Sequence, residues 1–234
     1  MIAIFKREIK GYFSSAIGYI FLAFFIVIAS YLFWMTNVMG NTTDVSGLFS
    51  ILVIFAMILI PVLTMRLLCE EKRQKTDQLL LTSPVSLFGI VFGKFLAALA
   101  VYAIGLSSTV LFAFTMAAYI GIDTATVIGN ILGTLLFGAA LISIGLFFSS
   151  LTENQIISFI VSLVVMLFLF IVNTFSSLVN NSVLSSAISS LSTSARYNNF
   201  AMGILSLSDV IYYVSVAAIF IFLTIRVLEK RRWG

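Results

Sequence analysis

The sequence predicts an all-α integral membrane protein with six transmembrane helices, and three observations lead to this fold class. Of the 234 residues, 61% are hydrophobic and only 9% are charged, and the mean hydropathy is +1.17. The apolar residues form several continuous runs, each long enough to cross the hydrocarbon core of a bilayer as a helix. These runs lack the alternation of apolar and polar residues that a membrane β-barrel requires.

The six apolar runs divide the chain into membrane-spanning segments within one domain, residues 1–234. The predicted spans are 17–36, 48–67, 88–119, 127–149, 155–174 and 209–228. The third span is longer than a bilayer requires, so we expect it to tilt or to protrude. Pro61 is the one proline inside a span and predicts a kink, which is either a hinge or a tolerated irregularity.

The basic residues predict the orientation of these spans. All but one of them fall on the same side: Lys6, Arg7, Lys10, Arg66, Lys72, Arg73, Lys75, Lys94, Arg226, Lys230, Arg231 and Arg232. Arg196 alone falls on the other side. Because basic residues concentrate in cytoplasmic segments, both termini are predicted to be cytoplasmic.

Residues 2–13 predict an amphipathic helix that lies in the membrane interface. Its apolar face contains Ile2, Phe5, Ile9, Tyr12 and Phe13, and its basic face contains Lys6, Arg7 and Lys10. This pattern is typical of interfacial helices. A simple basic anchor beside the membrane is the alternative.

Residues 68–86 hold the densest cluster of charge in the chain. Glu70 and Glu71 are predicted to end the second span, and a polar turn then leads to a short helix over 77–81 that stops before Pro84. A solvated loop does not need the three consecutive leucines of that helix, which therefore predict a docking surface. Leucines lying on the membrane surface are the alternative.

Four further polar segments are informative. In the inner turn 149–155, Thr152 is expected to cap the fifth span with Gln155 reaching back to it, and Glu153 suits the positive end of the helix. The outer loops 37–47 and 120–126 are short, with Asp44 and Asp123 but no basic residue. The outer segment 175–208 is serine-rich. Its residues Leu184, Ile188 and Leu191 keep helical spacing, which predicts a short amphipathic or re-entrant helix.

The composition also excludes several classes of function. The absence of histidine and the single cysteine, Cys69, exclude histidine catalysis, intramolecular disulfides and the usual zinc sites. No span carries an ionisable residue near its centre, which argues against an ion-coupled carrier. The basic residues lie beside the spans and do not indicate nucleic-acid binding. No span offers the groups of an intramembrane enzyme.

The segment from Gly89 to Lys94 is not a phosphate-binding loop. Only three residues separate its glycines, and Phe95 follows the lysine where such a loop needs serine or threonine. Gly89, Gly93 and Ala97 instead predict a face for close helix packing, from which Lys94 would extend to the cytoplasmic headgroups. A similar stripe, with Gly129 and Gly133, Ala140 and Ile144, predicts packing of the fourth span. A substrate path along that stripe is the alternative.

Three parts of the sequence resemble the permeases of ABC-2-type transporters. The first is Glu70-Glu71-Lys72-Arg73-x-x-Thr76-Asp77-Gln78-Leu79-Leu80-Leu81-Thr82-Ser83-Pro84-Val85-Ser86, followed by Gly93-Lys94. The second is Ser149-Ser150-Leu151-Thr152-Glu153-Asn154-Gln155, and the third runs from Asp209-Val210-Ile211-Tyr212-Tyr213 to the C-terminal Leu228-Glu229-x-Arg231-Arg232-Trp233. The resemblance extends over essentially the whole chain and points to the bacterial subgroup with gliding-motility and copper-enzyme-maturation permeases.

This resemblance implies a half-transporter of the bacterial inner membrane that is not itself an enzyme. Two permease subunits, identical or related, would form the pathway, and two cytoplasmic ABC ATPase subunits would bind ATP and magnesium. No cofactor or metal would bind to this chain. Residues 1–14 would form an elbow helix, 68–86 would contain the coupling helix, and 175–208 would form a re-entrant cap over the pore.

The resemblance also implies two groups of site residues. The ATPase-coupling interface would comprise Glu70, Glu71, Lys72, Arg73, Thr76, Asp77, Leu79, Leu80, Leu81, Pro84 and Glu153. The outer pore mouth would comprise Leu184, Ile188, Leu191 and Arg196. Charge reversal at Glu71 or Asp77 is expected to have a small effect if these groups lie on an exposed rim.

Two functions remain open at this stage. The first is the membrane subunit of an ATP-driven exporter. The second is a scaffold that transmits the motion of an ATPase to an extracytoplasmic partner, such as a membrane-anchored accessory protein, without transport. The substrate and the direction of movement cannot be read from these residues.

Overall fold

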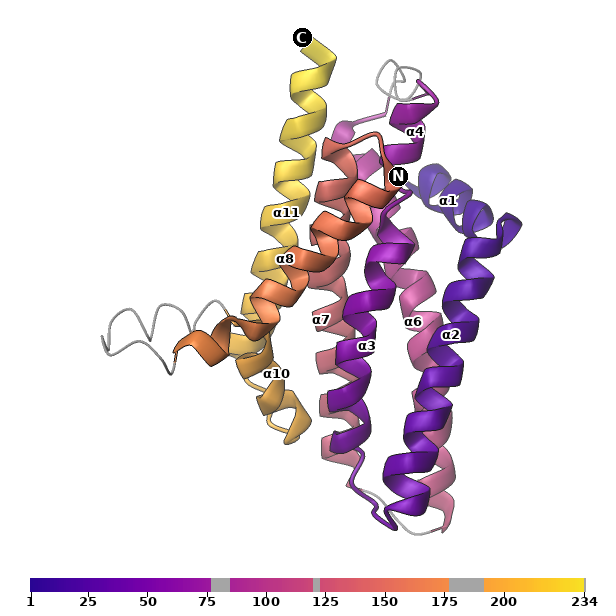
Figure 1. Ribbon diagram of the computed structural model, residues 1–234, viewed down its shortest axis with the longest axis vertical. Coiled ribbons are helices and arrows are strands. Elements are labelled where there is room, and N and C mark those ends of the chain that lie inside the picture. The colour runs from indigo at the N-terminus through magenta and orange to yellow at the C-terminus, as the bar shows by residue number, and fades with distance from the viewer. Residues whose placement is uncertain (77–84, 120–122, 177–191, 234) are drawn as a thin grey trace.

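The computed structural model describes residues 1–76, 85–119, 123–176 and 192–233, and this part of the chain contains helices and no strand (Figure 1). The helices of the first half are α1 (Ile2–Ser14), α2 (Ala16–Phe33), the π-helical turn η1 (Trp34–Met39), α3 (Ser46–Thr64), α4 (Cys69–Arg73) and α6 (Leu87–Tyr119). Those of the second half are α7 (Thr124–Leu151), α8 (Gln155–Ser176), α10 (Thr193–Ala201) and α11 (Leu207–Trp233).

The predicted number of membrane spans is confirmed within the described residues. Six helical segments are long and apolar enough to cross a bilayer: Ala16–Met39, Ser46–Arg73, Leu87–Met116, Thr124–Leu151, Gln155–Val172 and Leu207–Arg232. Each overlaps one of the six runs predicted from the sequence. The third, within the 33-residue helix α6, is the longest, in agreement with its long apolar run.

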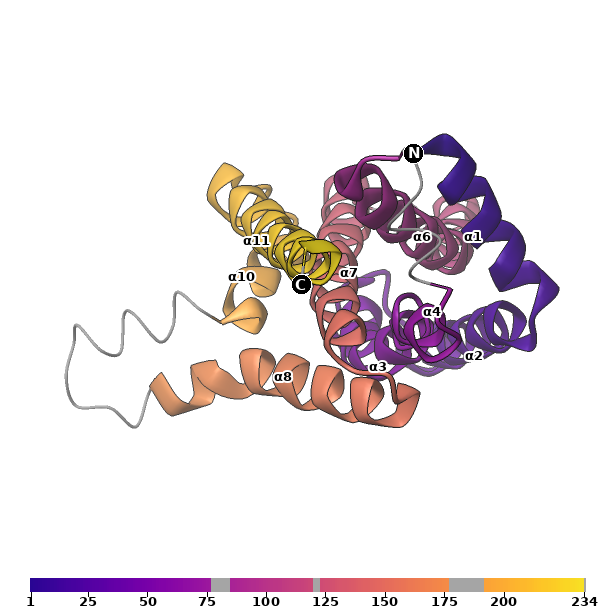
Figure 2. The same cartoon turned by 90° about the horizontal axis from the view of Figure 1, so that it is seen from above.

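Helix α7 lies at the centre of the bundle. It packs against α3, α6, α8, α10 and α11, and the view along the bundle shows it surrounded by them (Figure 2). Within the most apolar stretch of each span, 56–61% of the residues are buried in the spans that contain α3, α6 and α7. Only 22–28% of these residues are buried in the spans that contain α2, α8 and α11. The last three helices therefore form the periphery and leave wide apolar faces uncovered.

The small residues of α7 explain its central position. Gly133 lies against Phe200, Gly138 against the ring of Tyr102, and Gly145 against Thr64, so closely that no β-carbon fits at any of the three glycines. Helices without a hydrophobic driving force between them associate through such close contacts. The packing role predicted for the glycine stripe is confirmed at Gly133, and it extends to Gly138 and Gly145, which lie near the stripe in the sequence.

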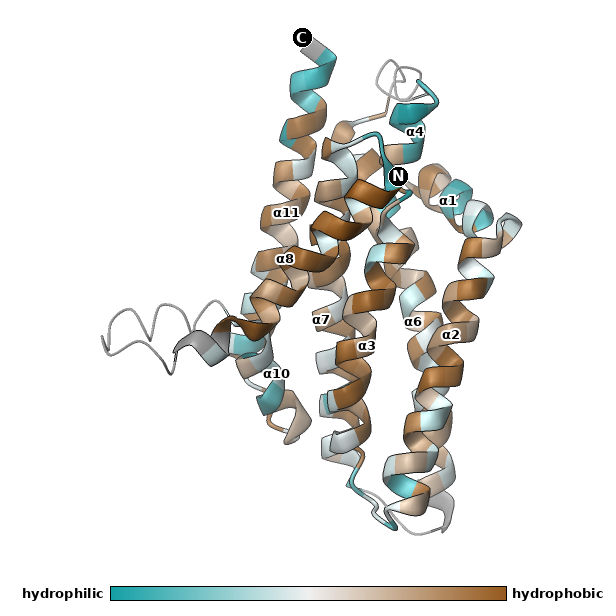
Figure 3. Cartoon of the chain, viewed as in Figure 1, coloured by the Kyte–Doolittle hydropathy of each residue, from teal (hydrophilic) through white to brown (hydrophobic). Residues whose placement is uncertain are grey.

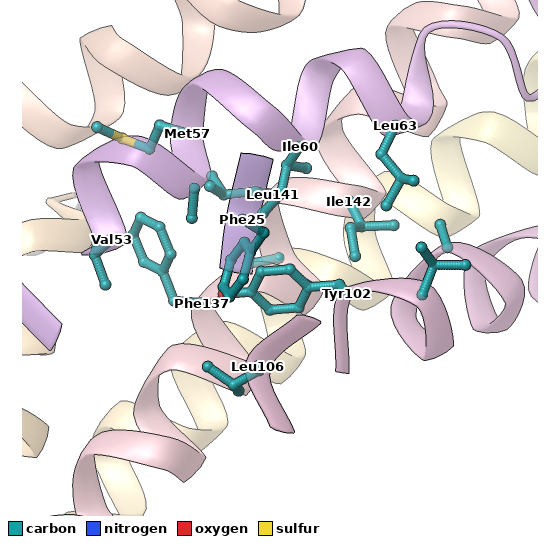
Figure 4. Close-up of a cluster of buried hydrophobic side chains, with 14 of the residues drawn as sticks. Phe25, Val53, Met57, Ile60, Leu63, Tyr102, Leu106, Phe137, Leu141 and Ile142 are labelled. Carbon is teal, nitrogen blue, oxygen red and sulfur yellow. The ribbon is translucent and has the colours of Figure 1, made fainter. Parts of the chain in front are cut away.

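A layer of large buried side chains joins α2, α3 and α6 to α7 (Figure 4). The rings of Phe25 and Tyr102 meet edge to face at 5.7 Å, an arrangement that aromatic pairs prefer. The Tyr102 hydroxyl donates a 3.0 Å hydrogen bond to the carbonyl oxygen of Thr134, so the one polar atom of this layer is satisfied. A buried polar group without a hydrogen bond costs free energy, and this bond removes that cost for the Tyr102 hydroxyl.

Both termini lie at the same end of the bundle, together with α1 and α4 (Figure 1). Hydrophilic residues gather at that end, on α1, α4 and the last turns of α11, whereas the middle of the bundle is apolar (Figure 3). A second hydrophilic group lies on α10, towards the other end. We refer to the first end as the terminal end.

One prediction about local structure needs correction. The helix of the second span ends at Thr64 rather than at Glu70 and Glu71, which instead form the first turn of the separate helix α4. The predicted apolar face of α1 does meet the bundle, because Tyr12 is buried and Phe5, Ile9 and Phe13 pack against the core, with Ile4 beside them. Ile2, on the predicted face, stays exposed.

The contact between Gly138 and Tyr102 gives a test of the packing of α7. A methyl group at Gly138 would overlap the tyrosine ring, and overpacking of this kind costs about 1–3 kcal/mol. We therefore expect Gly138→Ala to lower the thermal unfolding temperature of the purified protein. Gly47→Ala is the matched control, because a β-carbon there meets nothing within 4 Å. An equal unfolding temperature for Gly138→Ala and the wild type would contradict this packing.

Candidate functional site

The candidate site is the polar surface at the terminal end, centred on α4. Of the predicted coupling residues, Glu70, Glu71, Lys72 and Arg73 lie on α4 and Thr76 follows it. Arg73 is exposed, whereas the other three charged residues of α4 are half-buried. Asp77, Leu79, Leu80, Leu81 and Pro84 lie outside the described residues.

The hydroxyl of Ser149 holds the start of α4 against the end of α7. Its oxygen accepts hydrogen bonds from the backbone amides of Leu68 and Cys69, both at 3.1 Å, and the hydroxyl donates to the carbonyl oxygen of Met65 at 3.1 Å. One side chain thus satisfies backbone groups at the C-terminal end of α3 and at the N-terminal end of α4. Ser149 was named from the sequence only as part of a stretch that resembles the family, and its role in orienting α4 was not predicted.

An ion pair brings the two predicted coupling stretches together. The ammonium of Lys72 on α4 lies 3.2 Å from a carboxylate oxygen of Glu153, in the turn between α7 and α8. The side chain of Glu153 is 63% exposed, so the pair contributes at most about 1 kcal/mol. Its importance is geometric, because α4 and this turn form one continuous surface.

The predicted cap of the fifth span is wrong. Asn154, not Thr152, caps α8, because its side-chain oxygen accepts a 2.9 Å hydrogen bond from the amide of Ile156. The Thr152 hydroxyl oxygen instead accepts a 3.1 Å bond from the amide of Asn154. Serine, threonine and asparagine are all good caps, so the sequence alone did not decide which of the adjacent residues starts the helix.

A buried ionic cluster lies directly beneath this surface. The Lys94 ammonium on α6 lies 3.0 Å from a carboxylate oxygen of Glu8 on α1 and 2.9 Å from one of Glu71 on α4. It also donates a 2.7 Å hydrogen bond to the carbonyl oxygen of Leu67. Arg7 bridges the same two carboxylates, at 2.6 Å from Glu8 and 2.5 Å from Glu71. We call these four charged residues the Lys94 cluster.

Two expectations about this region are therefore corrected. Lys94 does not extend to the headgroups, since its side chain is only 1% exposed. The glycine face of α6 brings α1 so close, with Ile4 and Met1 against Gly93, that the lysine is covered and must pair with carboxylates. Glu71 belongs to this cluster, with its side chain 18% exposed, and not to an exposed rim.

The electrostatics of Glu8 follow from its neighbours. Burial would raise the pKa of its carboxyl group, but the charge of Lys94 and hydrogen bonds from Arg7 and Lys94 hold the pKa below its ordinary value. Glu8 is therefore ionised at neutral pH, and the two carboxylates balance the two basic groups of the Lys94 cluster. The cluster joins α1, α4 and α6 through neutralised charge.

A second interaction fixes α1 to the bundle. The hydroxyl of Tyr12 donates a 2.9 Å hydrogen bond to the carbonyl oxygen of Leu63, in the last turn of α3. Burial raises the pKa of this hydroxyl, so it remains a donor. A cavity of about 360 Å³ adjoins this contact and the Lys94 cluster, and Arg66 and Glu70, which pair with each other, also line it.

At the other end, Arg196, one of the residues predicted for the outer pore mouth, forms an ion pair. The Arg196 guanidinium on α10 lies 3.1 Å from a carboxylate oxygen of Asp209 on α11 and 4.5 Å from the ring centroid of Tyr212. Asn199 donates a 2.7 Å hydrogen bond to the other oxygen of Asp209. Arg196 thus ties α10 to α11, with three quarters of its side chain covered. Leu184, Ile188 and Leu191 lie outside the described residues.

Helix α10 is fastened by further polar contacts that the sequence did not predict. The hydroxyls of Tyr197 and Thr134 lie 3.0 Å apart, and the Tyr213 hydroxyl donates a 2.8 Å bond to the carbonyl oxygen of Thr193. The Ser194 hydroxyl donates to the carbonyl oxygen of Phe170 at 2.8 Å. Serine and tyrosine hydroxyls therefore connect α10 with α7, α8 and α11.

The comparison with protein families identifies this arrangement. Residues 36–228 match the model of the ABC-2 family transporter protein, which covers the chain from η1 to the last third of α11. The chain belongs to this family. It is accordingly a multi-pass membrane protein, the membrane subunit of an ABC transporter, and a transport subunit that partners with an ABC ATPase rather than a catalyst itself. The chain matches none of the curated proteins with which it was compared.

The family match begins after α1. Glu8 and Arg7 of the permease thus lie outside the matched residues, whereas Lys94, Glu71 and the 149–155 turn lie inside them. The Lys94 cluster connects the N-terminal helix, which the family model does not cover, to the charged helix α4, which it does cover.

The Lys94 cluster can be tested by removing its carboxylates. Glu8→Gln together with Glu71→Gln leaves the buried ammonium without a charged partner, which costs on the order of 3 kcal/mol. We expect a lower thermal unfolding temperature for this double variant, and partial recovery when Lys94→Met is added. Glu229→Gln, which removes only the exposed pair with Arg226, is the control. A double variant as stable as the control would show that the cluster does not hold these helices together.

Proposed function

We propose that the permease receives the motion of its ABC ATPase at the terminal end, through α4, the segment that follows it and the turn at 152–154. The observation that carries this proposal is the ion pair of Lys72 with Glu153, because it joins two separately predicted coupling stretches into one surface. Glu70, Arg73 and Thr76 belong to the same surface. The residues after Thr76, with Leu79, Leu80 and Leu81, would supply the apolar part of the contact.

The connections of α4 support this role. The Lys94 cluster links α4 to α1 and α6, and Ser149 links it to α7. A displacement of α4 would therefore reach α1 and the long helices α6 and α7 through short, charge-assisted or doubly hydrogen-bonded contacts. A loop attached only by its chain ends would not transmit such a displacement.

We further propose that the terminal end faces the cytoplasm of a bacterial cell. Every basic residue except Arg196 belongs to segments at or near that end, and such an excess is typical of cytoplasmic segments. In this orientation α1 would be an elbow helix in the inner leaflet interface, with the exposed Ile2 towards lipid. The segment that contains α10 would be the re-entrant part on the outer side.

The complete transporter would contain two permease subunits and two ATPase subunits, and the ATPases would bind ATP and magnesium. The uncovered apolar faces of the peripheral helices support a second permease subunit, although lipid also covers such faces. The direction proposed from the family resemblance is export.

The orientation is tested by cysteine labelling in a Cys69→Ala background, which is suitable because Cys69 is fully buried. Arg73 and Asn198 are both exposed, near opposite ends. We expect a membrane-impermeant maleimide to label Asn198→Cys in intact cells and Arg73→Cys only after the membrane is opened. The reverse pattern would invert the topology and remove the basis for an ATPase contact at α4.

The coupling surface is tested by co-purification of the ATPase. Leu80→Asp would bury an unpaired charge in the contact, at a cost on the order of several kcal/mol, so we expect loss of the ATPase with normal membrane insertion. Leu151→Asp is the matched variant, because Leu151 is exposed at the terminal end, beside the 152–154 turn. Retention of the ATPase by Leu80→Asp and its loss from Leu151→Asp would move the main contact to that turn.

A further inference from the structure

An apolar groove of about 420 Å³ runs along the outside of α7, between α6 and α11. Figure 2 shows α7 between these two helices. Phe88, Phe92 and Phe95 form one wall, and Ala218, Phe222 and Ile225 belong to the other. Every described residue that lines the groove is apolar except Tyr213, whose hydroxyl is already bonded to Thr193. The groove therefore offers no hydrogen bond to an occupant.

The length of the groove matches one leaflet of a bilayer. Its wall on α6 extends from Phe88 to Leu99, which is about 16 Å at the rise of an α-helix. The hydrocarbon core is about 30 Å thick, so the groove spans about half of it. Phe88 and Ile225 lie towards the terminal end, and Leu99 and Tyr213 lie deeper in the bundle. The groove thus belongs to the leaflet that meets the terminal end.

The width of the groove decides between its possible occupants. The whole empty space of the groove, about 930 Å³, gives a mean cross-section of about 58 Å² over that length. An α-helix with its side chains is about 10–12 Å across and needs on the order of 80 Å² or more. A helix from a second permease subunit therefore does not fit inside the groove. An extended hydrocarbon chain does.

Positive charge lies at the terminal end of the groove. The guanidinium of Arg226 lies 4.9 Å from the ring centroid of Phe222, a wall residue. Lys230, Arg231 and Arg232 follow in the last turn of α11. Glu229 is the one acidic residue among them and pairs with Arg226, so this turn keeps a net positive charge. Such basic clusters beside a membrane attract anionic headgroups.

We infer that the groove binds one acyl chain of an anionic phospholipid, whose phosphate lies near Arg226 and Arg232. An extended acyl chain matches the length, the width and the apolar lining of the groove. The phosphate matches the positive charge at the open end. A bound lipid would fill the space between α6 and α11. It would keep these two helices apart at the level of the phenylalanine wall.

The experiment uses the full-length chain in nanodiscs of phosphatidylglycerol and phosphatidylcholine in equal amounts. One of the two lipids carries a photoreactive group on its acyl chain, and mass spectrometry locates the labelled residues. We expect labelling between Phe88 and Leu99 and between Val214 and Ile225. Labelling by phosphatidylglycerol should exceed labelling by phosphatidylcholine by about fivefold, and Arg226→Gln with Arg232→Gln should remove this preference.

A pair of tryptophan variants separates the groove from general lipid contact. Ala218 is exposed within the groove and Ala23 is exposed on α2, away from it. Ala218→Trp should fill the groove and reduce the labelling, whereas Ala23→Trp should leave it unchanged. Equal labelling by the two lipids, equal labelling of α2 and the groove, or a crosslink to a second permease subunit within the groove would each overturn the proposal. No ATPase is required, so such a failure would leave the proposed coupling surface unaffected.

Discussion

The need to neutralise one buried charge determines how the terminal end is built. Lys94 lies on a helix whose small residues draw α1 onto it, and this removes its ammonium from water. An unpaired charge in that position costs several kcal/mol, so α1 and α4 must each supply a carboxylate. Arg7 then compensates the second negative charge. The positions of α1, α4 and α6 are thus linked by one electrostatic requirement.

The opposite end meets the same requirement with one ion pair and many neutral groups. Asp209 is almost completely buried, and each of its carboxylate oxygens has a partner. One pairs with Arg196 and the other accepts a hydrogen bond from Asn199. Around this pair, hydroxyls of tyrosine, serine and threonine bind backbone carbonyl oxygens or one another. Between the two ends, helix association rests on glycine contacts and aromatic packing. This distribution places the directional, charge-dependent contacts where the permease meets water or its partner.

The features of the fold that depend only on composition and periodicity could be predicted from the sequence. The six spans, the long third helix and the glycine packing of α7 follow from the apolar solvent, which requires helices and favours small residues at their contacts. The burial of Lys94 and Glu71 was not predicted, because it depends on α1 folding back across a sequence separation of more than 80 residues. The position of Lys94 directly after a face of small residues was a signal that another helix would cover it. This signal indicates burial of the lysine only when the covering helix carries carboxylates.

The same limit explains the errors at the ends of helices. The end of α3 and the orientation of α4 depend on the Ser149 hydroxyl, which is distant in sequence and has no recognisable spacing from the groups that it binds. The cap of α8 depends on a choice between adjacent residues of similar propensity. In each case the local sequence allows several solutions, and a tertiary contact selects one of them.

Helix α8 differs from the other spans in how it is attached, and this bears on where the permease can change shape. Ser158 and Ser162 on its buried face have hydroxyls without a hydrogen-bond partner, whereas Ser149 and Thr64 on the helices opposite are bonded. An unbonded hydroxyl in an apolar interface contributes packing but no directional constraint. The first half of α8 is therefore held against α3 and α7 mainly by contact area, while α4, α1 and α6 are fixed by charge. Motion that enters at α4 would be carried by charged contacts to α1 and α6, whereas Ser158 and Ser162 give the first half of α8 no directional bond that would resist sliding.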